Sequence, residues 1–115
     1  MFRAFKQAYP QVQTRTSSRY INTLTASQRE AIPKTWRIPS ERDAIQRTFQ
    51  FSDFNHAWAF MSRIALWSEK HNHHPEWFNV YSRVEVTWTT HECKGLSSRD
   101  IKAAEYCDAI YENKK

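Results

Sequence analysis

The spacing of apolar residues changes along this chain, and that change limits its possible folds more than any other feature. From Phe54 to about Lys70 the apolar side chains recur three and four positions apart, which predicts an amphipathic helix with Asp53 as its N-cap. The segments before and after it have the spacing and composition of β-strands, over residues 36–38, 44–51, 78–81 and 84–88. The chain therefore predicts one long helix between two pairs of strands.

Two shorter helices are predicted near the ends of this pattern. Thr25 or Ser27 can cap a helix over residues 26–32, which Pro33 ends, and Ser97 or Ser98 can cap a last helix over residues 99–111. Hairpin pairs with helices between them predict an α+β fold, in which an antiparallel sheet carries its helices on one face.

The long helix has a second apolar strip besides the one expected to face the sheet. Phe60 and Trp67 lie outside the main strip of residues 54, 57, 58, 61, 64 and 65. Such a strip favours either a wider contact with the core or an interface between copies of the chain, so helix 54–70 is a candidate oligomer interface.

The net charge of +5 is confined to the start of the chain. Residues 1–29 carry five Lys or Arg side chains and no Asp or Glu, and the remainder has equal numbers of basic and acidic residues. This neutrality argues against direct nucleic-acid binding by the folded part. We therefore divide the chain into a basic leader, residues 1–24, and one domain, residues 25–115.

The leader has the composition of a mitochondrial transit peptide. It is rich in Arg, Ser and Thr, and a short helix would place Phe2, Phe5 and Tyr9 on one face. A basic disordered tail is the alternative, and the protein is then expected in the cytoplasm. No apolar run approaches the roughly 20 residues of a membrane-spanning helix, so no membrane association is expected.

Several chemistries are excluded by what the sequence lacks. The chain has one glycine and contains no glycine-rich phosphate loop, nucleophile elbow or dinucleotide fingerprint. Cys93 and Cys107 make no disulfide framework. Their expected role is that of buried or incidental thiols.

The histidines carry the strongest chemical signal. His71, His73 and His74 follow the long helix, and His91 follows the last strand. If the helix end and the strand end meet at one edge of the sheet, their imidazoles can share a pocket and divide general acid and base roles. Solvated loop histidines are one alternative. A metal site built on His71 and His73, with His91, Glu92 or Cys93, is another.

Three stretches identify a family resemblance. They are residues 69–81 (EKHNHHPEWFNVY), 89–93 (TTHEC) and 95–100 (GLSSRD), supported upstream by residues 42–45, 51–55 and 60–63. Together they resemble pterin-4a-carbinolamine dehydratase over about residues 25–115. Residues 40–43 and Asn72 are most similar to the mitochondrial animal members, which agrees with the character of the leader.

The resemblance implies a fold, a reaction and a set of site residues. The fold is a four-stranded antiparallel sheet with three helices packed on one face, assembled into dimers or tetramers. The reaction is dehydration of 4a-hydroxytetrahydrobiopterin to quinonoid dihydrobiopterin, in tetrahydrobiopterin recycling, with no metal and no organic cofactor. The implied catalytic residues are His73, His74 and His91, and the substrate-binding residues are Asn72, Thr89, Thr90, Glu92, Trp36 and Glu69.

Within that scheme His73 and His91 transfer protons, and His74 holds and polarises the substrate. Three positions depart from the family pattern. Asn72 stands where many members have Asp, Thr35 replaces a usual Gly and Thr89 a common Ser. We expect these departures to change the catalytic efficiency and the pH optimum more than the identity of the reaction.

The resemblance also implies a competing function. Relatives act as dimerisation cofactors for a homeodomain transcription factor through the outer face of the long helix. We expect that face to include His56, Phe60, Arg63 and Trp67 here.

Overall fold

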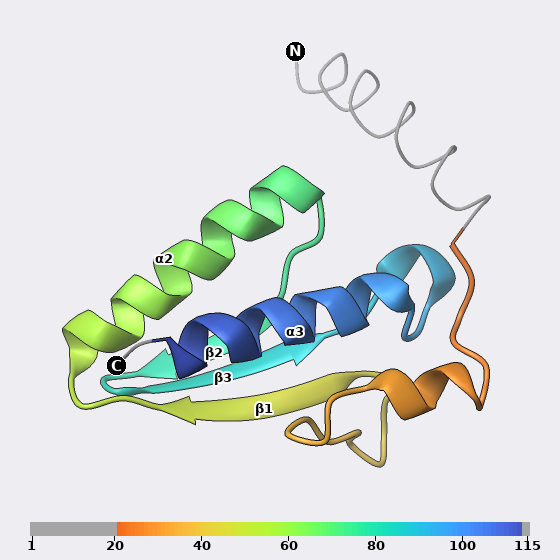
Figure 1. Cartoon of the computed structure of the whole chain (residues 1–115), viewed down its shortest axis with the longest axis horizontal. Coiled ribbons are helices and arrows are strands. Elements are labelled where there is room, and N and C mark those ends of the chain that lie inside the picture. The colour runs from red at the N-terminus through yellow and green to blue at the C-terminus, as the bar shows by residue number, and fades with distance from the viewer. Residues whose placement is uncertain (1–20, 114–115) are drawn as a thin grey trace.

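The computed structural model describes residues 21–113, so the expected helix around Phe2, Phe5 and Tyr9 lies outside the described residues. The elements are, in chain order, the 3-10 helix η1 (Gln28–Ala31), strand β1 (Ile45–Gln50), helix α2 (Phe54–His71), strands β2 (Glu76–Val80) and β3 (Arg83–Trp88), the 3-10 helix η2 (His91–Cys93) and helix α3 (Ser98–Glu112). The strands form an antiparallel sheet in the order β1-β3-β2, and α2 and α3 lie on the same side of it (Figure 1). Each helix within residues 21–113 is too short or too polar to span a lipid bilayer.

The two long helices begin at the caps that the sequence predicts. The Asp53 carboxylate accepts a hydrogen bond from the backbone N–H of His56 at 2.8 Å, which fixes the start of α2. Ser97 and Asp100 form a reciprocal capping box at the start of α3, so two backbone N–H groups are satisfied together. The two caps fix where α2 and α3 begin.

The prediction of a four-stranded sheet is wrong, because the described residues form three strands. The expected strand at 36–38 is reduced to one isolated antiparallel bridge between Arg37 and Gln46. Pro33 and Pro39 flank this segment, and a proline cannot donate a hydrogen bond to a ladder. Trp36 turns instead toward α3, where its indole N–H donates to the Asp108 carboxylate at 2.9 Å.

The prediction of three α-helices is also wrong, since the described residues contain two. The segment expected to form the first helix contains only η1, Gln28–Ala31. Pro33 restricts the residue before it to extended backbone, and Ile32 accordingly has φ −65° and ψ 127°. The hydroxyl of Thr25 accepts the Gln28 N–H at 3.2 Å, whereas Ser27 makes no side-chain capping bond.

The apolar core lies between the sheet and the two helices. Phe49 on β1 is at its centre, with ring centroids 4.7 Å from Phe60 of α2 and 5.0 Å from Tyr111 of α3. Phe60 is buried and Trp67 packs against Trp88, so the second apolar strip of α2 is a core contact. The expectation that Phe60 and Trp67 lie on the outer face is therefore wrong.

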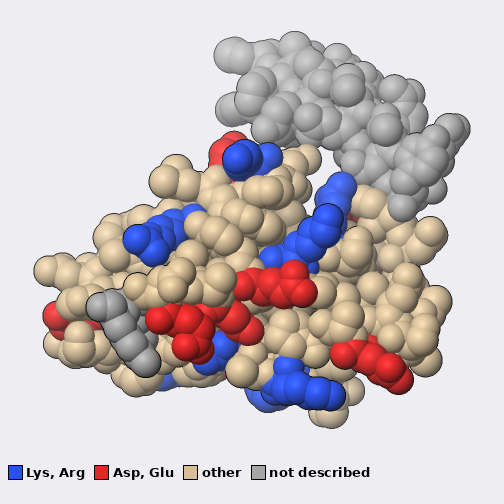
Figure 2. Space-filling view, viewed as in Figure 1, with Lys and Arg blue, Asp and Glu red and all other residues tan. Residues whose placement is uncertain are grey.

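Other apolar residues occupy the outer face of α2. Phe54 and Trp58 are stacked with ring centroids 5.9 Å apart, and both are exposed. Leu66, about two turns after Trp58, is exposed as well. The sequence assigned Phe54 and Trp58 to the core because helical spacing alone does not fix the rotation of a helix about its axis. Figure 2 shows basic and acidic side chains interspersed over one face of the described chain, whose residues 21–113 carry 11 Lys or Arg and 12 Asp or Glu.

Candidate active site

The turn after α2 directs the first two histidines. Asn72 ends the helix in the left-handed conformation, with φ 54° and ψ 44°. Asparagine adopts this conformation at less cost than most residues, and the following N–H of His73 then bonds back to the carbonyl of Ser68 at 3.0 Å. The chain leaves the helix axis at this point, so His73 and His74 project from the end of α2.

The loop after β3 supplies the third histidine. Thr90 and Gly95 pair through two backbone hydrogen bonds, of 3.0 and 3.2 Å, and close a short loop that contains η2. His91 is the first residue of η2, and Lys94 ends it with φ 58° and an N–H that donates to the carbonyl of His91. The imidazole of His91 is thus carried on a tightly closed turn.

Gly95 allows this loop to lie against the segment before β1. A Cβ atom at Gly95 would lie 2.4 Å from the Asp43 carboxylate, closer than any real contact of that kind. Asp43 is itself held by the N–H of Leu96 at 3.0 Å and by Arg29 at 2.8 Å. Burial works to raise the pKa of Asp43, but these hydrogen bonds and the Arg29 charge together lower it. The only glycine of the chain therefore permits the contact that anchors the histidine loop.

The end of α2 and the loop after β3 enclose one cleft of about 550 Å³. Its lining residues are Asn72, His73, His74, Pro75, Glu76, His91 and Glu92. The structure thus brings together the three histidines, Asn72 and Glu92, which come from two segments separated by the β2–β3 hairpin.

His73 is the most constrained side chain of the cleft. Its Nε2 lies 2.7 Å from the carboxylate of Asp100, and its ring stacks on Trp88 with centroids 5.2 Å apart. The same carboxylate accepts the Ser97 N–H at 2.9 Å and the Thr90 hydroxyl at 2.7 Å. Three donors converge on this carboxylate, so Nε2 is the nitrogen of His73 that carries the proton in the neutral ring, and Nδ1 keeps its lone pair.

Sequence reasoning missed Asp100 as a functional candidate. The signal was present, because a Ser-x-x-Asp capping pattern at the start of α3 lies within the residues that carry the family resemblance. What the sequence did not show is that Asp100 is fully buried and turned toward a histidine 27 positions earlier.

His74 has a more exposed environment. Its Nε2 lies 2.9 Å from the Glu69 carboxylate, one turn back on α2, and both side chains are mostly in solvent. Glu69 does not line the cleft. Its contact with the site is the hydrogen bond that orients His74.

An ion pair borders the cleft beside His91. Arg42 makes two hydrogen bonds to Glu76, of 2.6 and 2.9 Å. The Arg42 hydrogen bond lowers the pKa of Glu76 against the opposing effect of burial, and the charge of His91 lowers it further. Glu76 is therefore a fixed negative charge near His91.

Thr89 and Thr90 line a neighbouring cleft of about 290 Å³ with Arg42, Asp43, His91 and Lys94. Their hydroxyls already have partners. Thr89 donates to the carbonyl of Asp43 at 3.0 Å, and the buried hydroxyl of Thr90 donates to Asp100. Trp36 lines neither cleft, because it is buried in the core near Phe49.

The remaining candidate groups lie elsewhere. His71 stacks on Trp67, with centroids 4.2 Å apart, and within residues 21–113 no three His, Cys, Asp or Glu side chains are grouped so as to hold a metal ion. Burial raises the pKa of Cys107 to about 12 and raises that of Cys93 as well, so both thiols stay protonated at neutral pH.

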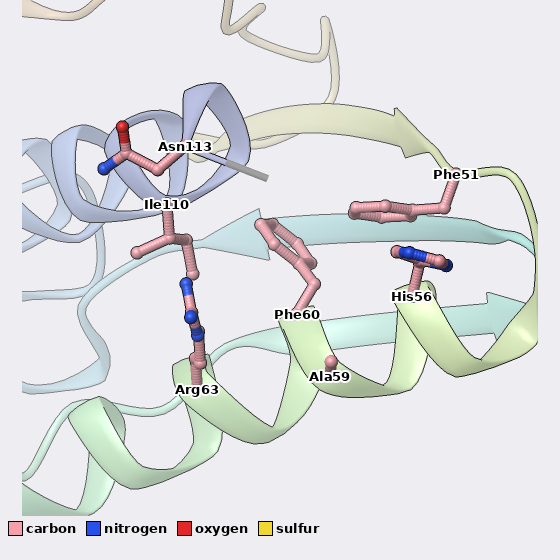
Figure 3. Close-up of a pocket in the computed structure, with 7 residues that line it drawn as sticks. All are labelled: Phe51, His56, Ala59, Phe60, Arg63, Ile110 and Asn113. Carbon is pink, nitrogen blue, oxygen red and sulfur yellow. The ribbon is translucent and has the colours of Figure 1, made fainter. Parts of the chain in front are cut away.

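A third cavity, of about 200 Å³, lies between α2 and the end of α3 (Figure 3). Phe51, Phe60 and Ile110 form its apolar part, and His56 and Arg63 project from α2 beside it. The His56 ring is hydrogen-bonded to Asp53 at 2.7 Å. With a single imidazole, this cavity lacks the paired acid and base groups of the histidine cleft.

This chain is similar to several proteins that share one family description. The family model described as pterin 4 alpha carbinolamine dehydratase matches residues 14–110, beginning inside the segment expected to be a leader. A protein of Burkholderia pseudomallei (strain 1710b) that carries the name of a pterin-4-alpha-carbinolamine dehydratase is 46% identical over 98 residues, which are 83% of this chain and 97% of that protein. A Burkholderia vietnamiensis protein of the same name is 48% identical over 94 residues, 78% of this chain and 91% of the relative.

A solved structure shows the same relationship. The crystal structure of a transcriptional coactivator/pterin dehydratase from Brucella melitensis matches with a TM-score of 0.74 and 46% sequence identity. The match covers 78% of this chain and 99% of that one.

Proposed function

Since this chain belongs to the pterin-4a-carbinolamine dehydratase family, we propose that it removes water from 4a-hydroxytetrahydrobiopterin to give quinonoid dihydrobiopterin. This reaction recycles tetrahydrobiopterin after it has served a hydroxylase. The observation that carries the proposal is the single cleft lined by His73, His74 and His91, with a buried carboxylate behind the first of them.

The proposed mechanism donates one proton to the leaving hydroxyl and removes one proton from the ring nitrogen. The lone pair of the ring nitrogen expels the hydroxyl from the adjacent carbon, and that oxygen leaves as water once an imidazolium donates a proton to it. A neutral imidazole accepts the proton that the nitrogen loses, so the products are water and the quinonoid ring. Proton transfers of this kind are typically worth about 10²- to 10⁴-fold in rate.

We assign the base role to His73 and the acid role to His91. Asp100 holds the proton of His73 on Nε2, which leaves the Nδ1 lone pair to accept a proton. His91 lies beside the anionic Glu76, which suits a residue that carries a positive charge before it donates. His74, oriented by Glu69, holds and polarises the substrate.

A stopped-flow dehydration assay on synthetic 4a-hydroxytetrahydrobiopterin tests the proposal. Wild type accelerates water loss above the spontaneous rate, and His73→Ala and His91→Ala each lower turnover by about a hundredfold or more. His56→Ala is the matched control, because it removes an imidazole from α2 outside the cleft. Full turnover in both cleft variants would remove the acid–base assignment.

We also propose that the protein acts in mitochondria. The basic, acid-free composition of residues 1–24 supports this location. A reporter fused to residues 1–24 should enter mitochondria, and a diffuse cytosolic signal would contradict the proposal.

The proposed assembly is a dimer or tetramer that uses helix 54–70. In support, Phe54, Trp58 and Leu66 are exposed on the outer face of α2. Replacement of Trp58 by Glu should shift the mass in sedimentation equilibrium toward the monomer. An unchanged mass would exclude this face as the interface.

The competing proposal is a binding module that dimerises a transcription factor. The exposed face of α2 favours it, and the Brucella melitensis protein is described as a transcriptional coactivator as well as a pterin dehydratase. Partner capture that survives His91→Ala, by a wild type that does not dehydrate the pterin, would favour this role over catalysis.

A further inference from the structure

The cleft beside the histidine cleft has no role in the proposed proton transfers. It measures about 290 Å³, and Arg42, Asp43, Thr89, Thr90 and Lys94 line it. His91 lines both clefts, so they meet at the imidazole assigned to proton donation. A ring bound against His91 could extend a substituent into this neighbouring space.

Most charged side chains around this neighbouring cleft have a partner of opposite charge within the described part of the chain, but Lys94 does not. Arg42 is neutralised by its bidentate contact with Glu76, and Asp43 by its contact with Arg29. Glu92, on the same loop as Lys94, lies 3.6 Å from Arg99. Of the Lys and Arg side chains that line this cleft, Lys94 is the one without an acidic partner among residues 21–113.

The backbone fixes Lys94 close to His91. Lys94 has φ 58°, a conformation that few residues other than glycine adopt, and its N–H donates to the carbonyl of His91 at 3.2 Å. The paired Thr90 and Gly95 close the loop around both residues. The backbone of Lys94 is therefore fixed relative to that of His91, and both residues line the neighbouring cleft.

We propose that this second cleft binds the substituent of the pterin ring, and that Lys94 gives anionic substituents preference over uncharged ones of similar size. The inference rests on the proposed function for the identity of the ring. An ammonium group attracts a carboxylate or phosphate in the cleft, whereas it gains only a neutral hydrogen bond from a hydroxyl group. Because Lys94 is exposed, solvent weakens the effect, and the expected preference is about two- to fivefold in Kd.

Binding of two unreactive oxidised pterins tests the inference without catalysis. Pterin-6-carboxylate carries the anion, and 6-hydroxymethylpterin is the uncharged analogue of similar size. Fluorescence titration of wild type should give the lower Kd for the carboxylate, and the ratio should fall as salt is added. Lys94→Gln should bring the two Kd values together, and Lys94→Glu should reverse their order.

Lys34→Gln is the control, since it removes the same charge from an exposed position that lines neither cleft. It should keep the wild-type preference. Equal affinity of wild type for both pterins, or a preference unchanged in Lys94→Gln, would overturn the subsite alone. Failure of both pterins to bind would overturn the subsite, whereas the proposed function is overturned by absence of dehydration in the stopped-flow assay. A Lys94-dependent preference without any dehydration would support the subsite and contradict the reaction.

Discussion

Two histidine–carboxylate pairs lie at the end of α2. Their contact distances are similar, but their burial and their further hydrogen bonds differ. His73 and Asp100 are 2.7 Å apart with side chains 6% and 0% exposed, whereas His74 and Glu69 are 2.9 Å apart with side chains 55% and 76% exposed. The buried carboxylate has two further donors, from Ser97 and Thr90. The exposed carboxylate can rotate into water at little cost.

The contrast shows that contact distance does not measure what a pair contributes. An exposed pair is weakened by solvent and is worth about 0–1 kcal/mol. A buried one holds its partner in a single orientation, and removing one member leaves polar groups without partners. We therefore expect the buried pair to set the tautomer of His73, and the exposed pair to adjust only the position of His74.

Among the variants that compare the two carboxylates, Asp100→Asn should have the largest effect. An Asn amide can accept the Ser97 N–H only by turning its NH₂ toward His73, which moves the imidazole proton to Nδ1 and removes the base from the cleft. We expect kcat to fall by about a hundredfold, with a smaller change in KM.

Ser97→Ala is the matched control for this variant. It removes a hydroxyl from the same buried network and should cost about 1 kcal/mol of stability while kcat stays near the wild-type value. Equal loss of kcat in the two variants, at equal stability, would show that the network is only structural.

Gly95→Ala extends the comparison to the loop that carries His91. The added Cβ would lie 2.4 Å from the Asp43 carboxylate, which two hydrogen bonds hold in place. We expect a loss of about 1–3 kcal/mol in the free energy of urea unfolding. Unchanged stability, with an unchanged dehydration rate, would mean that Asp43 can move away freely.

A pH titration of stability isolates Asp43. Its pKa is lowered in the folded protein, so its contribution is complete above its unfolded pKa of about 4 and is lost as the pH falls through the lower folded value. The stability difference between wild type and Asp43→Asn should therefore be largest at neutral pH and should shrink in acid. A difference that grows below pH ~4 would have the opposite sign and would refute this role.

The smallest effect should come from Glu69→Gln. The pair with His74 is exposed, so its loss should raise KM by no more than about fivefold and leave thermal stability nearly unchanged. A fall in kcat like that of Asp100→Asn would erase the distinction between the two pairs.

The sequence predicted the elements that are defined by strong local signals. The 54–70 periodicity with Asp53 at its start gave a helix that the structure bounds at Phe54–His71, and the hairpin strands lie close to their predicted positions. The expected meeting of helix end and strand end is what the structure shows, since His73, His74 and His91 line one cleft.

The sequence could not predict features that depend on distant parts of the chain. The segment around Trp36 alternates like a strand, but Asp108 and the flanking prolines divert it from the sheet. The rotation of α2, which buries Phe60 and exposes Trp58, is set by packing on Phe49 and Phe51. Asp100 became a site residue only when α3 was folded back against β3 and the turn that follows α2.

The pH dependence of kcat for enzymatic dehydration tests the central claim most directly, with the spontaneous rate subtracted at each pH. If a neutral His73 accepts one proton while a charged His91 donates another, wild type gives a bell-shaped profile. His73→Gln should then lose the acidic limb and His91→Gln the basic limb, each with a lower plateau. Both limbs persisting in both variants would show that the two imidazoles do not carry the protons.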